Sequence, residues 1–396
     1  MSKHNPLRDK SVAIIAYAEL QNQRRSGKGP YEFAAEIMEQ LTQRAGINHS
    51  DIDGLALISP IAEAGNTFYS IAMADTLGLS PRWSQVTDIG GCSPVGNVMR
   101  AAAAIAAGQC EMVMCIAADA SSGGVAGRRL GGFREEYMDP TGFQGPPVAF
   151  GLLSHAYDQK YGLNLEALGK LAVTQRNGAV VNENATDSLR KLITVEDYMN
   201  SRMIAEPVRL LDCVMRVDGG SGFLITTTER AKSLGIKKLV HPVAYSEITN
   251  FNPSDNTPDI TETGFATVGP EALEKAGMSC ADIDMFQPYD DFLIAIMLQM
   301  EQIGFCKRGE GSDYILSTDL SPTGALPTNT GGGQISCGQP GLGGGGVNLT
   351  ETLRQLFGEG GKRQVPNARN AMVTGIGFIP YLRNWGCSAA MILENG

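Results

Sequence analysis

Short apolar runs alternate with longer helical patterns along the first part of the chain. The runs at 11–18, 53–59 and 111–118 have the length of buried strands. A helical spacing of apolar and polar residues covers 31–45, and an alanine-rich helical segment covers 94–107. This alternation predicts a layered α/β fold with a largely buried sheet.

The same alternation returns in the second part of the chain. Strands are expected at 240–247, 284–288 and 388–393, and a helix is expected at 292–303. The segment 123–204 between the two parts differs, because it is polar, rich in helical patterns and punctuated by glycine and proline. We interpret this segment as a long insertion that lies over a site.

Two glycine-rich segments precede similar helices. Gly90–Ser93 opens a helix that ends at Gly108, and a strand follows it. Gly343–Gly346 opens a helix that ends near Gly358, and a strand at 371–374 follows it. This weak internal repeat predicts two similar halves. A glycine-rich start lets a ligand approach the backbone N–H groups at the positive end of each helix.

Composition and charge exclude several classes of protein. The net charge is −10 and no run of Lys or Arg occurs, so a nucleic-acid partner is not expected. The eight cysteines form no CxxC pair, which predicts no metal site and reduced thiols in a cytoplasmic protein. The most apolar stretch, 98–118, contains Arg100 and Glu111, so no membrane span is expected.

Four blocks of the chain carry a resemblance to a known family. In order and spacing, 90–109, 210–231, 287–305 and 327–356 resemble the thiolase superfamily, specifically its sterol-carrier-protein-type branch. The resemblance implies an α/β thiolase fold of five αβαβα layers with two similar halves and an inserted loop domain. It also implies a channel for pantetheine that leads to a site between the two central helices.

The resemblance also implies boundaries and partners. The N-terminal half would contain 1–122 and 205–239, the loop domain 123–204, and the C-terminal half 240–396. The substrate would be an acyl-CoA, with coenzyme A as part of the substrate and no bound cofactor. A homodimer is expected, together with a small partner protein that carries a zinc ribbon and an OB-fold.

The family's catalytic thiols and imidazole are replaced in this sequence. An ordinary thiolase has its nucleophilic cysteine at the N-terminus of the first central helix, where the helix dipole favours a thiolate. The family spacing places Gly91 there and matches Ser93 to the serine that follows, so Cys92 lies one residue late. The Gly-His-Pro motif is Gly338-Gln339-Pro340 here, and glutamine donates hydrogen bonds but does not titrate. Gly375 matches the second cysteine.

Tyr289 occupies the position at which the family carries an Asn or His. A phenol at this position can act as acid or base. Asp290 follows it, and Tyr381 is a candidate for a second titratable group. Structural interpretations remain open: Tyr289 as a buried structural tyrosine, Asp290 as a helix N-cap, and Gln339 as a loop amide that bonds to the backbone.

The loss of both thiols removes the covalent acyl-enzyme route and leaves a site that can hold a thioester and stabilise its enolate. The leading hypothesis is therefore a lyase for retro-aldol cleavage of a β-hydroxyacyl-CoA, as in family members that degrade sterol side chains. Tyr289 would take the β-hydroxyl proton with help from Asp290, and Gln339 would stabilise the enolate with backbone N–H groups. The expected substrate-binding residues are Gly91, Ser93, Gly338 and Gly375.

Two alternatives remain at this point. A thiolase or acyltransferase would carry out Claisen-type chemistry on a β-ketoacyl-CoA with Cys92 as its nucleophile. A catalytically silent thiolase-like subunit would bind acyl-CoA without turnover.

Overall fold

Nine strands form one mixed sheet in the order β3-β2-β4-β7-β1-β8-β11-β10-β9. The computed structural model describes residues 7–123, 139–143, 145–252, 259–378 and 385–396. β1 and β8 pair at one position, where Ile14 lies opposite Val240. The sheet therefore divides there into a five-stranded N-terminal part and a four-stranded C-terminal part. The N-terminal strands are β1 (Val12–Glu19), β2 (Gly54–Ile58), β3 (Trp83–Thr87), β4 (Met112–Ala120) and β7 (Asp218–Thr227).

The C-terminal part combines long antiparallel strands with one short parallel strand. β10 pairs antiparallel with β11 and parallel with β9. β11 also pairs antiparallel with β8. The strands of this part are β8 (Val240–Thr249), β9 (Phe286–Gln287), β10 (Asn370–Gly377) and β11 (Cys387–Asn395).

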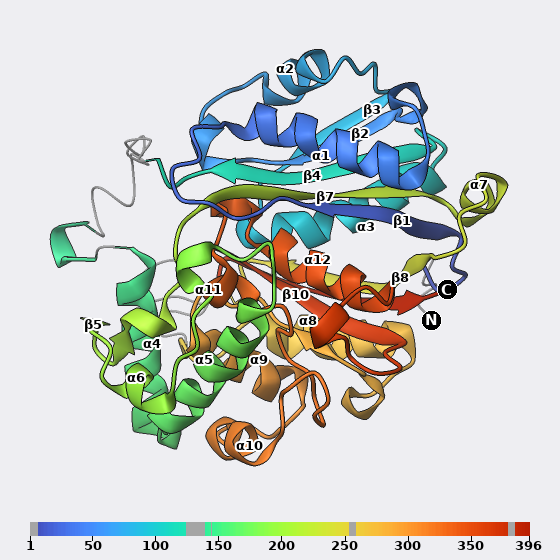
Figure 1. Cartoon of the computed structure of the whole chain (residues 1–396). Helices are drawn as coiled ribbons and strands as arrows, with labels where there is room; N and C mark the ends of the chain where they lie inside the picture. Colours follow the sequence, from blue (N-terminus) through green and yellow to red (C-terminus); the bar gives the residue numbers. More distant parts are fainter. Residues whose placement is uncertain (1–6, 124–138, 144, 253–258, 379–384) are drawn as a thin grey trace.

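The helices and the two parts of the sheet form five layers (Figure 1). The three largest buried clusters lie between these layers. α1 (Pro30–Ala45) and α2 (Tyr69–Thr76) cover the outer face of the N-terminal part. α3 (Ser93–Ala106) and α12 (Gly345–Leu356) pack between the two parts of the sheet. α8 (Phe265–Ala276) and α9 (Leu293–Ile303) cover the outer face of the C-terminal part. The expected five-layer α/β fold is confirmed.

A helical region follows β4 in the sequence and precedes β7. Its helix α5 packs on α9, α10 (Gly311–Ser317) and α11 (Gly333–Cys337), so the region lies on one side of the C-terminal part (Figure 1). This is the helix-rich insertion expected from the sequence, although its boundaries as a separate domain remain a prediction. The region contains α4 (Pro146–Tyr161), α5 (Leu165–Val180), α6 (Val195–Met199) and the hairpin of β5 (Met203–Ala205) and β6 (Val208–Arg209).

Most expected elements near the site are present with small shifts at their ends. The helix expected at 94–107 is α3, and the helix expected at 292–303 is α9. The sequence analysis did not predict β3, β7 or the short helix α7 (Thr228–Ser233). No helix in the described residues is long and apolar enough to cross a membrane.

Candidate active site

The two central helices begin close to each other at glycine contacts. The 3-10 turn η3 (Gly90–Cys92) leads into α3, and the 3-10 turn η9 (Gly341–Gly343) leads into α12. A Cβ atom on Gly345 would lie 2.3 Å from the carbonyl oxygen of Gly91, so no larger residue fits there. The first N–H groups of a helix have no partner within it, which makes this end positive. Because the two helices begin beside each other, their positive ends face the same region.

Tyr289 occupies the space that a side chain at position 91 would need. A Cβ atom on Gly91 would lie 2.3 Å from the Cε2, Cζ and Oη atoms of Tyr289. The aromatic ring and its hydroxyl group therefore lie directly against the start of α3. In this backbone arrangement the tyrosine at 289 therefore requires a glycine at 91.

The turn between β9 and α9 fixes the position of Tyr289. Its backbone N–H donates to Oγ1 of Thr374 at 2.8 Å, and its carbonyl oxygen accepts from Nε2 of Gln299 at 2.8 Å. Its hydroxyl oxygen accepts from Nε2 of Gln339 at 3.3 Å. The side chain is 4% exposed, so both ends of the residue are constrained.

Gln339 is held by backbone and side-chain contacts together. Its N–H donates to the carbonyl of Met215 at 2.8 Å, and its carbonyl accepts from the N–H of Val217 at 3.0 Å. Nε2 also donates to Oε1 of Gln334 at 3.1 Å. Gln339 is partly exposed, and these two contacts use both N–H groups of its Nε2 atom.

Gln334 and Asp291 are site residues that the sequence analysis missed. Gln334 is fully buried on α11, and its Nε2 has no hydrogen-bond partner among the described residues. Asp291 follows Asp290 in the Tyr289 turn and is partly exposed. No signal in the sequence shows that Gln334 packs beside Gln339, because side-chain direction in a short helix depends on the tertiary fold.

Burial determines the protonation state of Tyr289. Desolvation raises the pKa of the phenol well above its usual value, and the nearby negative charges of Asp291 and the other acidic groups raise it further. The phenol therefore carries its proton at neutral pH. This differs from the expectation that Tyr289 takes the β-hydroxyl proton.

The carboxyl group of Asp290 makes structural hydrogen bonds beside Tyr289. Its Oδ1 atom accepts from the N–H of Gln334 and from Nδ2 of Asn348, both at 3.0 Å. Its Oδ2 atom accepts from the N–H of Ile335 at 3.2 Å and from Nε2 of Gln175 at 2.6 Å. The carboxyl group thus caps α11, whereas the N-cap of the helix that follows it, α9, is Phe292. Burial raises the pKa of Asp290 to about 7 despite these donors.

The expected substrate-binding positions mainly shape the backbone. A Cβ atom on Gly375 would lie 2.7 Å from Cα of Cys92, so the family's second thiol has no room. Oγ of Ser93 accepts from the N–H of Ile89 at 3.1 Å. Gly338 has φ +99°, a conformation that favours glycine. Tyr381 lies outside the described residues.

Cys92 is fully buried beside the candidate site. It is 0% exposed and packs with Cys387 and Ala389 of β11. Burial first, and the neighbouring thiol of Cys387 second, raise the pKa of Cys92 well above its ordinary value. The thiol therefore stays protonated, which does not suit a nucleophile. Among the described residues no group of three or more His, Cys, Asp or Glu could hold a metal ion.

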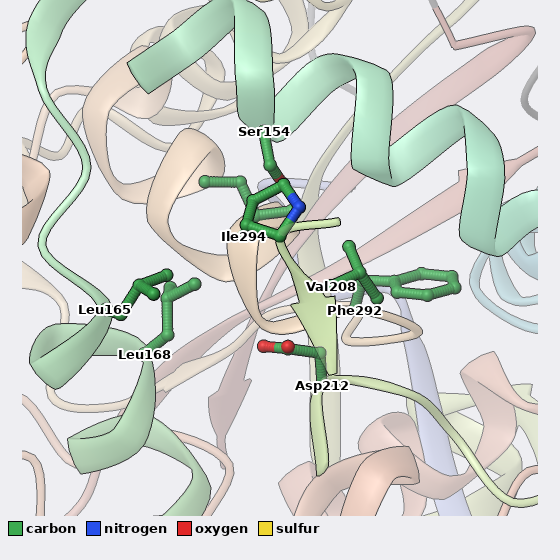
Figure 2. Close-up of a pocket in the computed structure, with 8 residues that line it drawn as sticks. Ser154, Leu165, Leu168, Val208, Asp212, Phe292 and Ile294 are labelled. Atoms are coloured by element: carbon green, nitrogen blue, oxygen red, sulfur yellow. The ribbon is translucent and has the colours of Figure 1, made fainter. Parts of the chain in front are cut away.

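A small cavity of about 10 Å³ is lined by residues of α4, α5 and α9. Figure 2 shows Leu165 and Leu168 facing Val208 and Phe292 across it. Its one carboxylate, Asp212, accepts from the Tyr198 hydroxyl at 2.9 Å and from the Arg209 N–H at 2.6 Å. The cavity contains neither Tyr289 nor Gln339, so we place the reacting site at the helix N-termini.

Comparison with known proteins assigns the family. A family model described as thiolase C-terminal domain-like matches residues 246–392. The steroid side-chain-cleaving aldolase of Thermomonospora curvata is 31% identical over 348 residues, which cover 82% of this chain and 85% of that protein. The chain belongs to the thiolase superfamily.

Other members of the thiolase superfamily agree with this assignment. The 17-hydroxy-3-oxo-4-pregnene-20-carboxyl-CoA lyase of Mycobacterium tuberculosis is 29% identical over 370 residues, covering 88% of this chain and 92% of that protein. The solved structure of an Ltp2-ChsH2(DUF35) aldolase has a TM-score of 0.84 and 27% identity, covering 97% of this chain and 98% of that one. An SCP2-thiolase like protein from Mycobacterium smegmatis shares the fold, with a TM-score of 0.74 and 20% identity over 97% of this chain and 77% of that one.

Replacing Cys92 with alanine tests its role in this thiolase-family chain. We expect the variant to keep the wild-type catalytic rate and to lose about 1 kcal/mol of unfolding free energy, because the change leaves a small cavity. Intact-protein mass spectrometry after incubation with acyl-CoA should find no acyl adduct on either protein. An adduct on the wild type that disappears in the variant would contradict this and restore Cys92 as a nucleophile.

Proposed function

We propose that this chain is an acyl-CoA-dependent C–C lyase that cleaves a β-hydroxyacyl-CoA thioester by retro-aldol chemistry. The contact between Tyr289 and Gly91 carries the proposal, because the phenol fills the space of the family's nucleophilic thiol. Without that thiol, a thioester can bind but cannot form an acyl-enzyme. The similarity to proteins named as an aldolase and a CoA lyase supports this function.

The proposed reaction breaks the bond between Cα and Cβ of the substrate. The β-hydroxyl group loses its proton and becomes a ketone or aldehyde, and the electron pair moves to the thioester enolate. The N-termini of α3 and α12 would stabilise the negative charge on the enolate oxygen, together with Nε2 of Gln339 once the ligand replaces one of its two present acceptors. Protonated Tyr289 would deliver the proton to Cα, which releases a shortened acyl-CoA.

The proposal also covers the acyl group of the substrate and the location of the protein in the cell. We propose an acyl-CoA with a steroid-like apolar group as the first substrate to test, since two relatives are named for steroid chemistry. Coenzyme A would enter as part of the substrate, with no further cofactor. We propose a cytoplasmic location, since all eight cysteines are free.

The assembly is a further part of the proposal. A solved relative is named Ltp2-ChsH2(DUF35) aldolase, which supports a heteromeric partner for this chain. We propose that this partner is a small protein with a zinc ribbon and an OB-fold. β3 lies at an edge of the sheet, and Ile71 of the neighbouring α2 and its N-cap residue Phe68 are 66% and 68% exposed (Figure 1). An exposed edge strand beside apolar side chains supports a homodimer through this end of the sheet.

The decisive experiment separates the lyase from its alternatives. Purified protein, alone and with a candidate partner, is incubated with β-hydroxyacyl-CoA esters, and the products are identified by mass spectrometry. A ketone or aldehyde together with a shortened acyl-CoA would support the lyase. Acyl transfer to a second CoA thioester would instead indicate the acyltransferase, and binding without turnover would indicate the silent subunit.

Gln339→Ala tests the stabilisation of the enolate. Loss of one preorganised donor to an oxyanion lowers kcat by about 10²- to 10³-fold. We expect KM to change little, because the charge on the oxygen develops only in the transition state. Steady-state kinetics of the variant would be compared with those of Gln43→Ala, a change on the exposed face of α1. A larger effect on KM than on kcat would show that Gln339 only binds substrate.

A further inference from the structure

The proposed cleavage needs a group that accepts the β-hydroxyl proton. Tyr289 and Gln339, which contact each other in the candidate site, do not provide one. Gln339 does not titrate. Burial keeps the phenol of Tyr289 protonated, so it enters the reaction as a donor. The acceptor must therefore be another group that lies near the phenol and can reach a ligand.

Asp290 and Asp291 both adjoin Tyr289, but only Asp291 has capacity for a ligand. Asp290 is 0% exposed, and its two oxygens already accept from four donors. Asp291 is partly exposed, and its Oδ1 atom is buried with no hydrogen-bond partner among the described residues. An unpartnered carboxylate oxygen can accept a proton from a bound hydroxyl group.

The fold holds Asp291 in this position through its backbone. Its carbonyl oxygen accepts from the N–H of Val214 at 3.3 Å, and Phe292 forms a bridge with Cys213. The same turn also holds Tyr289 through the contact with Thr374. After burial, the charge of Asp291 has the largest effect on the pKa of Tyr289, which it raises.

We infer that Asp291 is the catalytic base: it accepts the β-hydroxyl proton and returns it, through Tyr289, to Cα of the shortened acyl-CoA. The inference rests on the proposed lyase function. As the C–C bond breaks, the hydroxyl proton moves to the carboxylate and the electron pair moves to the enolate. Tyr289 then protonates Cα, and the carboxylic acid reprotonates the phenolate. The transferred proton is conserved, and the protein returns to its starting state.

Asp291 titrates in the range that this role needs. Burial first, and the charge of Asp290 second, raise the pKa of Asp291 to about 7. The titratable groups that face it are Tyr289 and Asp290 in its own turn and Cys213 in the segment packed against it. Because the base must be ionised, kcat/KM should fall as pH decreases through about 7.

The raised pKa also predicts that Asp291→Asn folds. A carboxyl group with a higher pKa in the folded state destabilises that state as pH rises from its unfolded value of about 4 towards the folded value. Removing the charge should therefore not lower the melting temperature at pH 8. Asp291→Glu keeps the carboxyl group and serves as the second variant.

The test measures cleavage of a β-hydroxyacyl-CoA by the wild type and both variants from pH 5 to pH 9. We expect Asp291→Asn to lose about 10²- to 10⁴-fold in kcat at pH 8 with KM nearly unchanged. Its residual rate should lack the fall at low pH, whereas Asp291→Glu should regain part of the rate with that fall at a shifted pH. An Asp291→Asn variant with the wild-type rate and pH profile would overturn the role of Asp291 and leave the proposed lyase function in place. A wild type that cleaves no β-hydroxyacyl-CoA would overturn the proposed function and the inference together.

Discussion

Replacing Tyr289 with phenylalanine is expected to lower kcat for retro-aldol cleavage by about 10²- to 10⁴-fold. The change removes only the hydroxyl group that would protonate Cα. The ring remains against Gly91, and the backbone bonds to Thr374 and Gln299 remain in place. Gln339 loses one acceptor but keeps its bond to Gln334.

The measurement combines turnover with stability. The melting temperature of Tyr289→Phe should stay close to that of the wild type, so that the loss of rate reports chemistry and not folding. Tyr31→Phe is the matched control, because its hydroxyl group bonds to Glu63 outside the site. If Tyr289→Phe keeps the wild-type kcat, Tyr289 is a structural tyrosine and another group must protonate Cα.

Restoring the family's cysteine at position 91 is expected to abolish cleavage without creating a thiolase. A Cβ atom there would lie 2.3 Å from three atoms of Tyr289, so the ring must move and its hydroxyl group leaves the site. Overpacking of this kind costs about 1 to 3 kcal/mol of unfolding free energy. The new thiol would have no acid/base cysteine opposite it, because Gly375 packs directly on Cys92.

Thermal unfolding, cleavage assays and thiolase assays would be made on Gly91→Cys and on Gly123→Cys. Position 123 is exposed and a Cβ atom there meets nothing within 4 Å, so the control introduces the same side chain in open space. We expect the control to keep wild-type stability and cleavage. Wild-type cleavage by Gly91→Cys would show that the contact with Tyr289 does not decide the chemistry.

The elements around the site are predictable where periodicity and glycine signals agree. α3 and α12 follow their glycine-rich segments as expected, and β10 and β11 lie where apolar runs predict strands. β7 is not predictable in this way, because its first residues are Asp, Gly and Ser, which have low strand propensity. Packing explains them: a Cβ atom on Gly222 would lie 2.3 Å from Cγ2 of Ile37 on α1.

The candidate site is partly predictable from the family's spacing. That spacing selects Gly91, Tyr289 and Gln339, and the structure brings the three together. It does not reveal which of the two adjacent carboxyl groups keeps an unpartnered oxygen, because side-chain directions in a turn follow no simple period. The expected helper, Asp290, caps α11, while Asp291 retains an unpartnered oxygen.

The contact between Gly91 and Tyr289 also limits how this site could change over generations. A single substitution at 91 displaces the tyrosine, whereas a single loss of the tyrosine leaves a site with neither a proton donor nor a nucleophile. The effects of the two positions are therefore strongly coupled, as expected for residues in direct contact. Under the proposed mechanism each single change at this pair removes cleavage activity, so the two positions form an epistatic barrier to change at this site.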